Sequence, residues 1–186
     1  IDVGDILSYG KLEAGFRGYL AIKGGFKSKV MYGSSSFFKP ITYGNRLMDG
    51  DMVPFIYKEI FKPKISEIKV DSFLGETILK VHKAPEFDIL TEIQLQVLFS
   101  KDFTVAKENN RMAYQLNELL EGHTHSMLTS ATLPGTVQLT PAGKLIILMK
   151  DGQTTGGYPR ILQLSDKAIA ILAQKRQGAT ISFELV

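Results

Sequence analysis

The chain has 186 residues, of which 44% are hydrophobic and 22% charged, and its formal net charge at pH 7 is +3. Because its lysines and arginines are scattered rather than gathered into a basic stripe, this globular composition argues against a nucleic-acid partner. The chain has no cysteine, which excludes disulfides and thiolate nucleophiles within it. It also has no apolar run of the roughly 20 residues that cross a bilayer. Together these features predict a cytoplasmic protein without a membrane partner.

Short runs of β-forming residues, bounded by Gly, Pro, Asn and Asp, dominate the chain. In chain order, we predict strands over residues 18–22, 51–57, 77–82, 136–139, 145–149 and 180–185. The run 145–149 is entirely apolar, as in a strand that is buried on both faces, whereas 181–185 alternates as half-buried strands do. A domain boundary is predicted at residues 61–64, where a proline flanked by lysines separates two apolar runs.

Two stretches are predicted to be helices, because each begins with a capping residue and continues with an apolar stripe at helical spacing. The first is capped by Thr91, and its apolar face comprises Ile93, Val97 and Leu98. The second is capped by Ser165, and its stripe comprises Ile169, Leu172 and Ala173. We expect its last turn to hold Lys175 and Arg176, and Gly178 to end it. Many short strands with two helices predict a mainly β fold, a barrel or sandwich with helical plugs.

The strongest local feature is the segment 150–160, which follows the apolar strand predicted over 145–149. Gly156 and Gly157 allow positive φ angles and close backbone approach, and Lys150 and Arg160 flank them with positive charge. Neutral hydrogen-bonding groups come from Gln153, Thr154 and Thr155. Such a loop could hold a carboxylate, carbamoyl or phosphate group on its backbone N–H groups, or its threonines could satisfy only the backbone of the loop itself. Both interpretations stay open, because the segment matches neither a P-loop nor a Rossmann motif.

Two further groups of residues are candidates for chemistry. Arg111 could clamp a carboxylate and Tyr114 could donate a hydrogen bond or a proton, or the two could only hold a loop and fill a barrel mouth. His123 and His125 lack a third metal ligand nearby, so we predict an exposed loop and no metal site. The sequence shows no self-sufficient catalytic set, which indicates either a protein that is not an enzyme by itself or a site shared with another chain.

Several of these segments together resemble the family of allophanate hydrolase subunit 2 and of the C subunit of 5-oxoprolinase. Residues 134–138 and 143–159 resemble its pattern PGxIQxPxxGxPIxLMxDxQTTGGYP closely. Residues 17–25 resemble RxYLAxxGG, and 33–36 resemble GSxST with Ser36 in place of Thr. Residues 45–51 resemble GRxLxxGD with Asn45 in place of Gly, and 110–116 resemble DRMGxRL with departures at Asn110, Ala113 and Gln115.

The resemblance implies a mainly β fold of cyclophilin-like β-barrel domains with a few short helices. The family pattern begins with a further segment, TVQDxGR, that this sequence does not contain. We therefore expect residues 1–62 to be the remnant of an N-terminal cyclophilin-like domain with an incomplete barrel, and 63–186 to be the C-terminal barrel. The exposed strand edges would be covered by further residues, by a partner or by a second copy in a homo-oligomer. An intact mass near 20.6 kDa would contradict the expected missing segment.

The resemblance also implies a function that depends on other chains. The leading hypothesis is a subunit of an ATP-dependent 5-oxoprolinase, which converts 5-oxo-L-proline to L-glutamate. It would be active only with an inhibitor-like subunit 1 protein (type B) and a larger subunit (type A), and ATP would bind on the complex. The alternatives are an allophanate hydrolase or urea carboxylase type of carboxyltransferase subunit, and a non-catalytic antagonist of a kinase-inhibitor protein.

The implied site of this hypothesis uses both candidate groups of residues. Arg111 and Tyr114 are the predicted catalytic residues, Arg111 as a carboxylate clamp and Tyr114 as a hydrogen-bond donor. The predicted substrate-binding residues are Gln153, Thr154, Thr155, Gly156, Gly157 and Tyr158, which would form an oxyanion or phosphate cradle walled by the Tyr158 ring. The changes at Ala113 and Gln115 leave the substrate open among 5-oxoproline, allophanate and a urea-derived compound.

Overall fold

A computed structural model describes residues 3–39, 41–44, 46–56 and 72–186. The chain divides into two compact units, one formed by residues 1–17 with 71–186 and the other by residues 18–70. Among the described residues of the second unit, the assigned β pairing consists of the isolated bridges Phe26–Phe55 and Met31–Ser34. The strand predicted over 18–22 is therefore not formed, and Phe55 alone pairs in 51–56, because a strand needs a continuous partner for its backbone groups. The boundary predicted at 61–64 lies outside the described residues.

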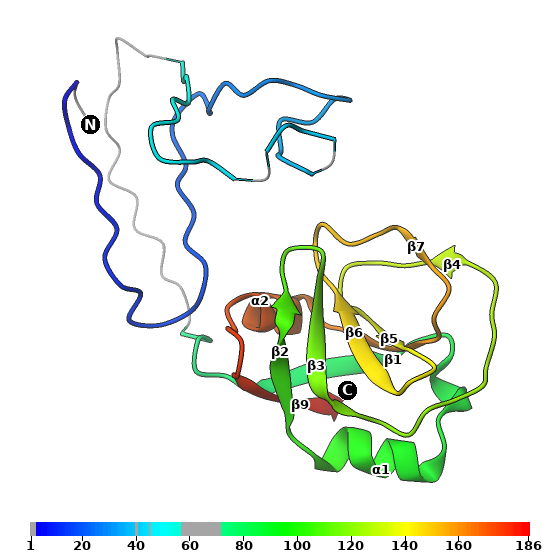
Figure 1. Cartoon of the computed structure of the whole chain (residues 1–186). Coiled ribbons are helices and arrows are strands. Elements are labelled where there is room, and N and C mark those ends of the chain that lie inside the picture. Colours follow the sequence, from blue (N-terminus) through cyan, green and yellow to red (C-terminus); the bar gives the residue numbers. More distant parts are fainter. Residues whose placement is uncertain (1–2, 40, 45, 57–71) are drawn as a thin grey trace. The chain divides into compact units, whose positions relative to one another are not determined.

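In the first unit, strands close into a barrel in the order β1-β8-β5-β6-β3-β2-β9 (Figure 1). Neighbouring strands are antiparallel, except for the parallel pair of β1 and β9, which starts at Ile78 opposite Ser182. The barrel strands are β1 (Ile78–Lys83), β2 (Phe103–Asn109), β3 (Ala113–Leu119), β5 (Thr136–Leu139), β6 (Lys144–Leu148), β8 (Arg160–Leu164) and β9 (Thr180–Leu185). A separate two-stranded sheet pairs β4 (Ser130–Ala131) with β7 (Thr155–Gly156). The barrel confirms the predicted mainly β fold.

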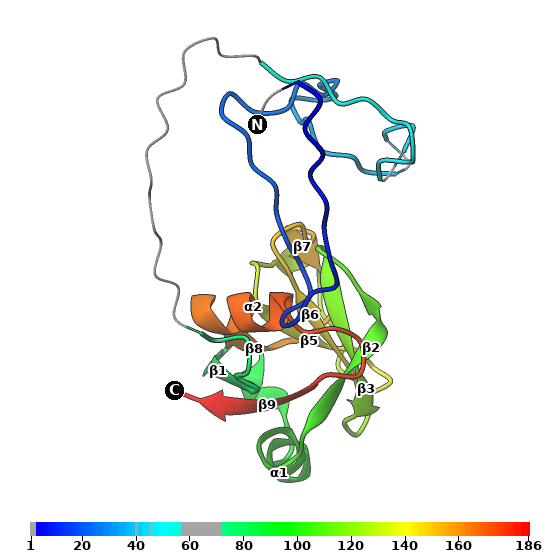
Figure 2. The same cartoon turned by 90° about the vertical axis from the view of Figure 1, so that its left-hand side faces the viewer.

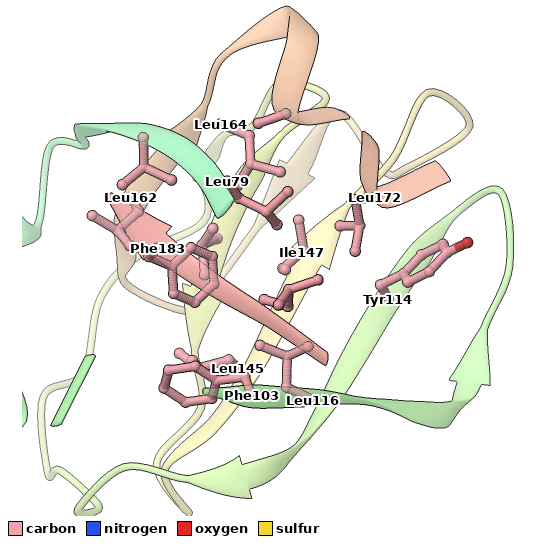
Figure 3. Close-up of a cluster of buried hydrophobic side chains, with 14 of the residues drawn as sticks. Leu79, Phe103, Tyr114, Leu116, Leu145, Ile147, Leu162, Leu164, Leu172 and Phe183 are labelled. Atoms are coloured by element: carbon pink, nitrogen blue, oxygen red, sulfur yellow. The ribbon is translucent and has the colours of Figure 1, made fainter. Parts of the chain in front are cut away.

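The interior of the barrel is filled by side chains that alternate inward along the strands. Figure 3 shows this cluster, in which the rings of Phe103 and Phe183 lie 5.5 Å apart. Other fully buried members are Leu79, Leu116, Leu145, Ile147, Leu162 and Leu172. The Tyr114 ring is also buried, but it lies at the margin of the cluster with its hydroxyl pointing outward (Figure 3). The barrel is therefore a packed core, and its chemistry must lie at its ends and loops.

The first helix, α1 (Glu92–Ser100), begins as predicted. The Thr91 hydroxyl accepts from the Gln94 backbone N–H at 3.1 Å, and the Gln94 side chain accepts from the Thr91 N–H at 2.9 Å. The predicted apolar face was partly wrong, because Gln94 and Leu98 are buried whereas Ile93 is 65% exposed. The Gln94 amide donates to the Glu121 carbonyl at 2.8 Å, and this bond compensates its burial.

The second helix, α2 (Asp166–Ala173), is capped as predicted by Ser165, whose hydroxyl accepts from the Ala168 N–H at 3.2 Å. It ends before the predicted last turn, so Lys175 lies beyond it. Lys175 is 7% exposed and donates to the Leu74 carbonyl at 3.0 Å, and burial holds its pKa below the usual value although the charge of Glu76 opposes this. A short 3₁₀ turn, η1 (Phe87–Ile89), precedes α1, and the two helices lie on opposite sides of the barrel (Figure 2).

Candidate functional site

The loop that the sequence analysis singled out connects β6 to β8, which are the two neighbours of β5 in the barrel. Its centre is held by β4, where Ser130 pairs with Gly156 and Ala131 with Thr155. Thr132 fixes the preceding turn, because its backbone N–H donates to the Thr154 carbonyl at 2.9 Å and its hydroxyl donates to the Gln153 carbonyl at 2.6 Å. The loop is thus an ordered flap on the barrel, held largely through its backbone.

Most of the polar side-chain surface of this loop is accessible to solvent. Gln153, Thr154, Thr155 and Tyr158 are all exposed. Within the part of the chain that the structure describes, the hydroxyls of Thr154 and Thr155 form no hydrogen bond. Their role is therefore not to satisfy the backbone of the loop, a task that Thr132 and β4 carry out instead. Both hydroxyls are available to a ligand as donors and acceptors.

A buried glutamine supports the loop from inside the barrel. The Gln138 side chain on β5 is fully buried. Its Nε2 lies 3.5 Å from the Tyr158 carbonyl, and its Oε1 lies 3.5 Å from Nε2 of Gln153, so it touches both ends of the loop. A Cβ atom on Gly156 would lie 2.4 Å from Gln138 Nε2, whereas a Cβ on Gly157 would meet nothing within 4 Å. Neither glycine has a positive φ, so close approach at Gly156 is the structural requirement.

The difference between these glycines gives a first prediction. Gly156→Ala is expected to lower the free energy of unfolding by about 2 kcal/mol, because Gln138 is packed inside the barrel and cannot move aside for a methyl group. Gly157→Ala is expected to change it by less than about 0.5 kcal/mol. Urea titration of both variants measures this difference. Equal stability of the two variants would contradict the proposed support by Gln138.

Arg111 lies next to the beginning of this loop. It sits at the tip of the β2–β3 hairpin, where the Asn110 side chain accepts from the Met112 N–H at 2.7 Å. The hairpin and the loop are joined through their backbones, because Asp151 N–H donates to the Arg111 carbonyl at 3.0 Å and Met149 N–H to the Met112 carbonyl at 2.9 Å. The structure thus brings Arg111 together with the loop, as a shared site requires.

Tyr114 does not point toward the loop. Its hydroxyl accepts a hydrogen bond from Nη1 of Arg17 at 2.7 Å and donates to the Lys175 carbonyl at 3.1 Å, just beyond the end of α2. The two predicted catalytic residues are therefore held in different surroundings, although they are three positions apart in the sequence. Whether Tyr114 donates to a ligand stays a prediction.

An ion pair with two parallel hydrogen bonds anchors the far end of the loop. Nε and Nη2 of Arg160 donate to the two oxygens of Glu86 at 2.8 and 2.7 Å, and Nη1 donates to the Ala131 carbonyl at 2.6 Å. These hydrogen bonds from Arg160 hold the pKa of the Glu86 carboxyl below its usual value, although burial opposes the shift. The pair ties the turn at Glu86, the start of β8 and the β4 strand into one unit.

The other cations beside the loop also have carboxylate partners. Nε of Arg111 lies 2.7 Å from Asp151, and Nζ of Lys150 lies 3.9 Å from Asp166. The Arg111 side chain is 60% exposed, so its pair is accessible to solvent. Because Lys150, Arg111 and Arg160 are each balanced by a carboxylate, the loop presents neutral hydrogen-bonding groups rather than a strong positive field.

His123 contacts both the neighbouring His125 and the strand β5. His123 Nε2 lies 3.1 Å from the Leu139 carbonyl, and its Nδ1 accepts from the His125 backbone N–H at 3.1 Å. Within the described ranges, no group of three His, Asp or Glu side chains could hold a metal ion. In the same ranges, no helix is long and apolar enough to cross a membrane.

Sequence reasoning missed three residues that organise these sites, namely Arg17, Thr132 and Gln138. Arg17 and Gln138 lie inside the segments that carry the family resemblance, so their positions were visible. Their contacts were not, because Arg17 meets Tyr114 across 97 positions and Gln138 meets the loop across a strand pair. Thr132 carried no signal in the sequence analysis.

Comparison with known proteins agrees with this architecture. A sequence model described as carboxyltransferase domain, subdomain A and B, matches residues 1–185. The chain is 31% identical over 197 residues to the C subunit of 5-oxoprolinase from Haemophilus influenzae, covering 100% of the chain and 61% of that protein. It is 31% identical over 189 residues to the C subunit of 5-oxoprolinase from Escherichia coli, covering 97% of the chain and 59% of that protein. The chain therefore spans about three-fifths of the length of these relatives.

Solved structures show the same fold. A crystal structure of TTHA0988 is similar with a TM-score of 0.76 and 26% identity, over 92% of this chain and 34% of that chain. The structure of the K. lactis urea amidolyase is similar with a TM-score of 0.71 and 20% identity, over 94% of this chain and 12% of that chain. At that identity, the second likeness concerns the fold alone.

Proposed function

The chain belongs to the family of the carboxyltransferase domain, subdomain A and B, and from this premise we propose that it acts as part of a 5-oxoprolinase. The names of the two bacterial relatives support this proposal. In the proposed reaction, the lactam ring of 5-oxo-L-proline is hydrolysed to L-glutamate, coupled to the hydrolysis of ATP. Partner subunits of the inhibitor-like B type and the larger A type are required. The proposed division into an N-terminal remnant (residues 1–62) and a barrel domain (63–186) belongs to the same hypothesis.

The observation that carries this proposal is that the hydroxyls of Thr154 and Thr155 are exposed and form no hydrogen bond with any residue that the structure describes. A lactam presents one N–H donor and one carbonyl acceptor, and it has no charge. Hydroxyls and a Gln153 amide, which both donate and accept, are complementary to such a group. Gly156 brings the backbone of the flap close to the barrel, so the polar side chains are held on a rigid support.

ATP is assigned in this proposal to the partner subunits. A triphosphate carries several negative charges, and its binding calls for cations without partners or for a nest of backbone N–H groups. Around the loop, Lys150, Arg111 and Arg160 are each matched by a carboxylate, so these residues do not fit the group. The proposed role of this chain is to bind and orient the lactam, with the Tyr158 ring as a wall beside the polar groups.

A reconstituted complex tests the proposal. The chain is co-expressed with its inhibitor-like partner and its larger partner, and ATP hydrolysis that depends on 5-oxo-L-proline is measured. Thr155→Val, which removes the hydroxyl and keeps the shape, is expected to lower kcat/KM by about tenfold, the cost of one hydrogen bond to a bound substrate. Thr124→Val, at an exposed position in the segment between β3 and β4, serves as the matched control.

Two outcomes would oppose the proposal. A tight complex that does not turn over 5-oxo-L-proline would contradict the proposed 5-oxoprolinase function. Turnover of urea instead would favour a carboxyltransferase of the urea type. Unchanged activity of Thr155→Val in an active complex would remove the loop from the site while leaving the reaction in place.

A further inference from the structure

Within the first unit, Arg17 is held in a fixed position by contacts at the end of α2. The Gln174 side chain accepts from the backbone N–H groups of Phe16 and Arg17 at 2.8 and 2.9 Å, and donates to the Arg17 carbonyl at 3.2 Å. The guanidinium carbon lies 5.0 Å from the centre of the Phe16 ring and 5.4 Å from that of Tyr114. Backbone and side chain are both restrained, so little rotamer freedom remains to be lost when a ligand binds.

Among the residues that the structure describes, one nitrogen of this guanidinium makes all of its hydrogen bonds. Nη1 donates to the Tyr114 hydroxyl and to the Ala173 carbonyl, both at 2.7 Å, so both of its protons are engaged. Nε and Nη2 form no hydrogen bond with any residue that the structure describes, and no described carboxylate pairs with Arg17. Of the three remaining N–H groups, Nε–H and one of the two on Nη2 lie along one edge of the planar group, the edge that receives a carboxylate through two parallel hydrogen bonds.

Arg160 shows in the same chain what completes such an arrangement. Its Nη1 also donates to a backbone carbonyl, that of Ala131, and its Nε and Nη2 donate to the two oxygens of Glu86. Arg17 has the carbonyl but, among the described residues, not the carboxylate. A half-buried guanidinium without a counter-charge is unusual, because desolvated charges are normally paired.

We propose that Arg17 binds the carboxylate of a small-molecule ligand through Nε and Nη2, and that the Tyr114 hydroxyl and the Ala173 carbonyl position it. This site goes beyond the proposed function, because none of these groups belongs to the loop 150–160. It also gives Tyr114 a role as a positioning residue rather than a proton donor. The partial negative charge at the end of α2, where the Ala173 carbonyl lies, keeps the guanidinium in place without occupying its free edge.

Side-chain NMR of the ¹⁵N-labelled chain tests the proposal directly, both alone and in complex with its partner subunits. The probes are sodium acetate, 5-oxo-L-proline and 2-pyrrolidinone, the last being the same lactam without a carboxylate. Acetate and 5-oxo-L-proline are expected to shift the Nε–H resonance of Arg17, and 2-pyrrolidinone to leave it in place. Arg17→Gln identifies this resonance by its disappearance.

Affinity measurements then separate binding from folding. Arg17→Gln is expected to weaken acetate and 5-oxo-L-proline binding by about ten- to a hundredfold, the value of a charged hydrogen-bonding pair. Arg176→Gln, an exposed arginine just beyond the same helix, is the matched control and should bind like the wild type. Tyr114→Phe keeps the ring and removes one acceptor of Nη1, so an intermediate loss is expected. Thermal melting of each variant checks that the barrel remains folded.

Several results would overturn the proposal. These are the absence of a carboxylate-dependent shift at Arg17 in both the chain and the complex, undiminished binding in a folded Arg17→Gln variant, and a loss of carboxylate binding with Arg111→Gln but not with Arg17→Gln. Because acetate binding needs no lactam chemistry, the Arg17 site can stand even if the complex does not act on 5-oxo-L-proline. Equally, the complex can be active while Arg17 proves irrelevant.

Discussion

Gly143→Ala is expected to lower the free energy of unfolding by about 3 kcal/mol or more, which corresponds to a fall in the melting temperature of roughly 10 °C for a chain of this size. Gly143 lies in the turn between β5 and β6, with a φ of 83°. A Cβ atom there would lie 2.0 Å from the Leu120 carbonyl oxygen, and this oxygen belongs to the backbone rather than to a side chain that can rotate away. The Leu120 N–H also donates to the Gly143 carbonyl at 2.9 Å, so relieving the clash would break that bond.

Gly178 provides the matched control, because it has nearly the same backbone angle in open space. Its φ is 82°, and a Cβ atom would meet nothing within 4 Å. Gly178→Ala should therefore cost only the strain of a left-handed alanine, about 1 kcal/mol. Differential scanning calorimetry of the two variants separates the clash from the strain. A Gly143→Ala protein as stable as the Gly178→Ala protein would show that residues 120 and 143 are not packed as the structure has them.

Breaking the pair of Glu86 and Arg160 is the second change with a large expected effect. Arg160→Ala is expected to destabilise the chain by about 3 kcal/mol, because it leaves a largely buried carboxylate and the Ala131 carbonyl without their donors. Glu86→Ala should cost about 2 kcal/mol. The double variant should lose less than the sum of the two, since one interaction is removed in both. Urea unfolding of the four proteins measures the coupling, and simple additivity would contradict it.

The same pair predicts a dependence on pH. The folded pKa of Glu86 is lower than that of the unfolded chain, so its contribution is complete above the unfolded pKa of about 4.3 and is lost as the pH falls through the folded pKa. The difference in stability between the wild type and Glu86→Gln should therefore be constant near neutral pH and shrink in acid. A difference that grows as the pH falls would have the wrong sign for this interaction.

The fold could be predicted where the sequence signals were local. The strands predicted over 77–82, 136–139, 145–149 and 180–185 correspond to β1, β5, β6 and β9, within a residue or two. Both N-caps were also correct, because Thr91 and Ser165 make bonds that span only three positions. The strands β2, β3 and β8 were not predicted, although their inward residues form part of the core. These segments of mixed composition form strands only because each of them has two neighbouring strands in the barrel.

Two predictions about the helices failed for a related reason. Which side of α1 is buried depends on the part of the barrel that it meets, and the structure buries Gln94 in place of Ile93. An amide inside is tolerated because the Glu121 carbonyl accepts its hydrogen bond. Lys175 was expected to complement the dipole at the end of α2, but it turns to the Leu74 carbonyl instead. Neither partner could be inferred from the helix itself, since both are distant in the sequence.

The sequence by itself determined the family, the mainly β class and the loop 150–160, because a long run of specific residues and the spacing of apolar positions are local properties of the chain. The tertiary structure alone decided which of the residues noted in the sequence lie close together. It placed Arg111 beside the loop and paired it with Asp151, turned the Tyr114 hydroxyl to Arg17, and left one edge of the Arg17 guanidinium open among the described residues. The physical reason is that a hydrogen bond or an ion pair depends on distances of a few ångströms, which closure of the barrel sets between residues far apart in the sequence.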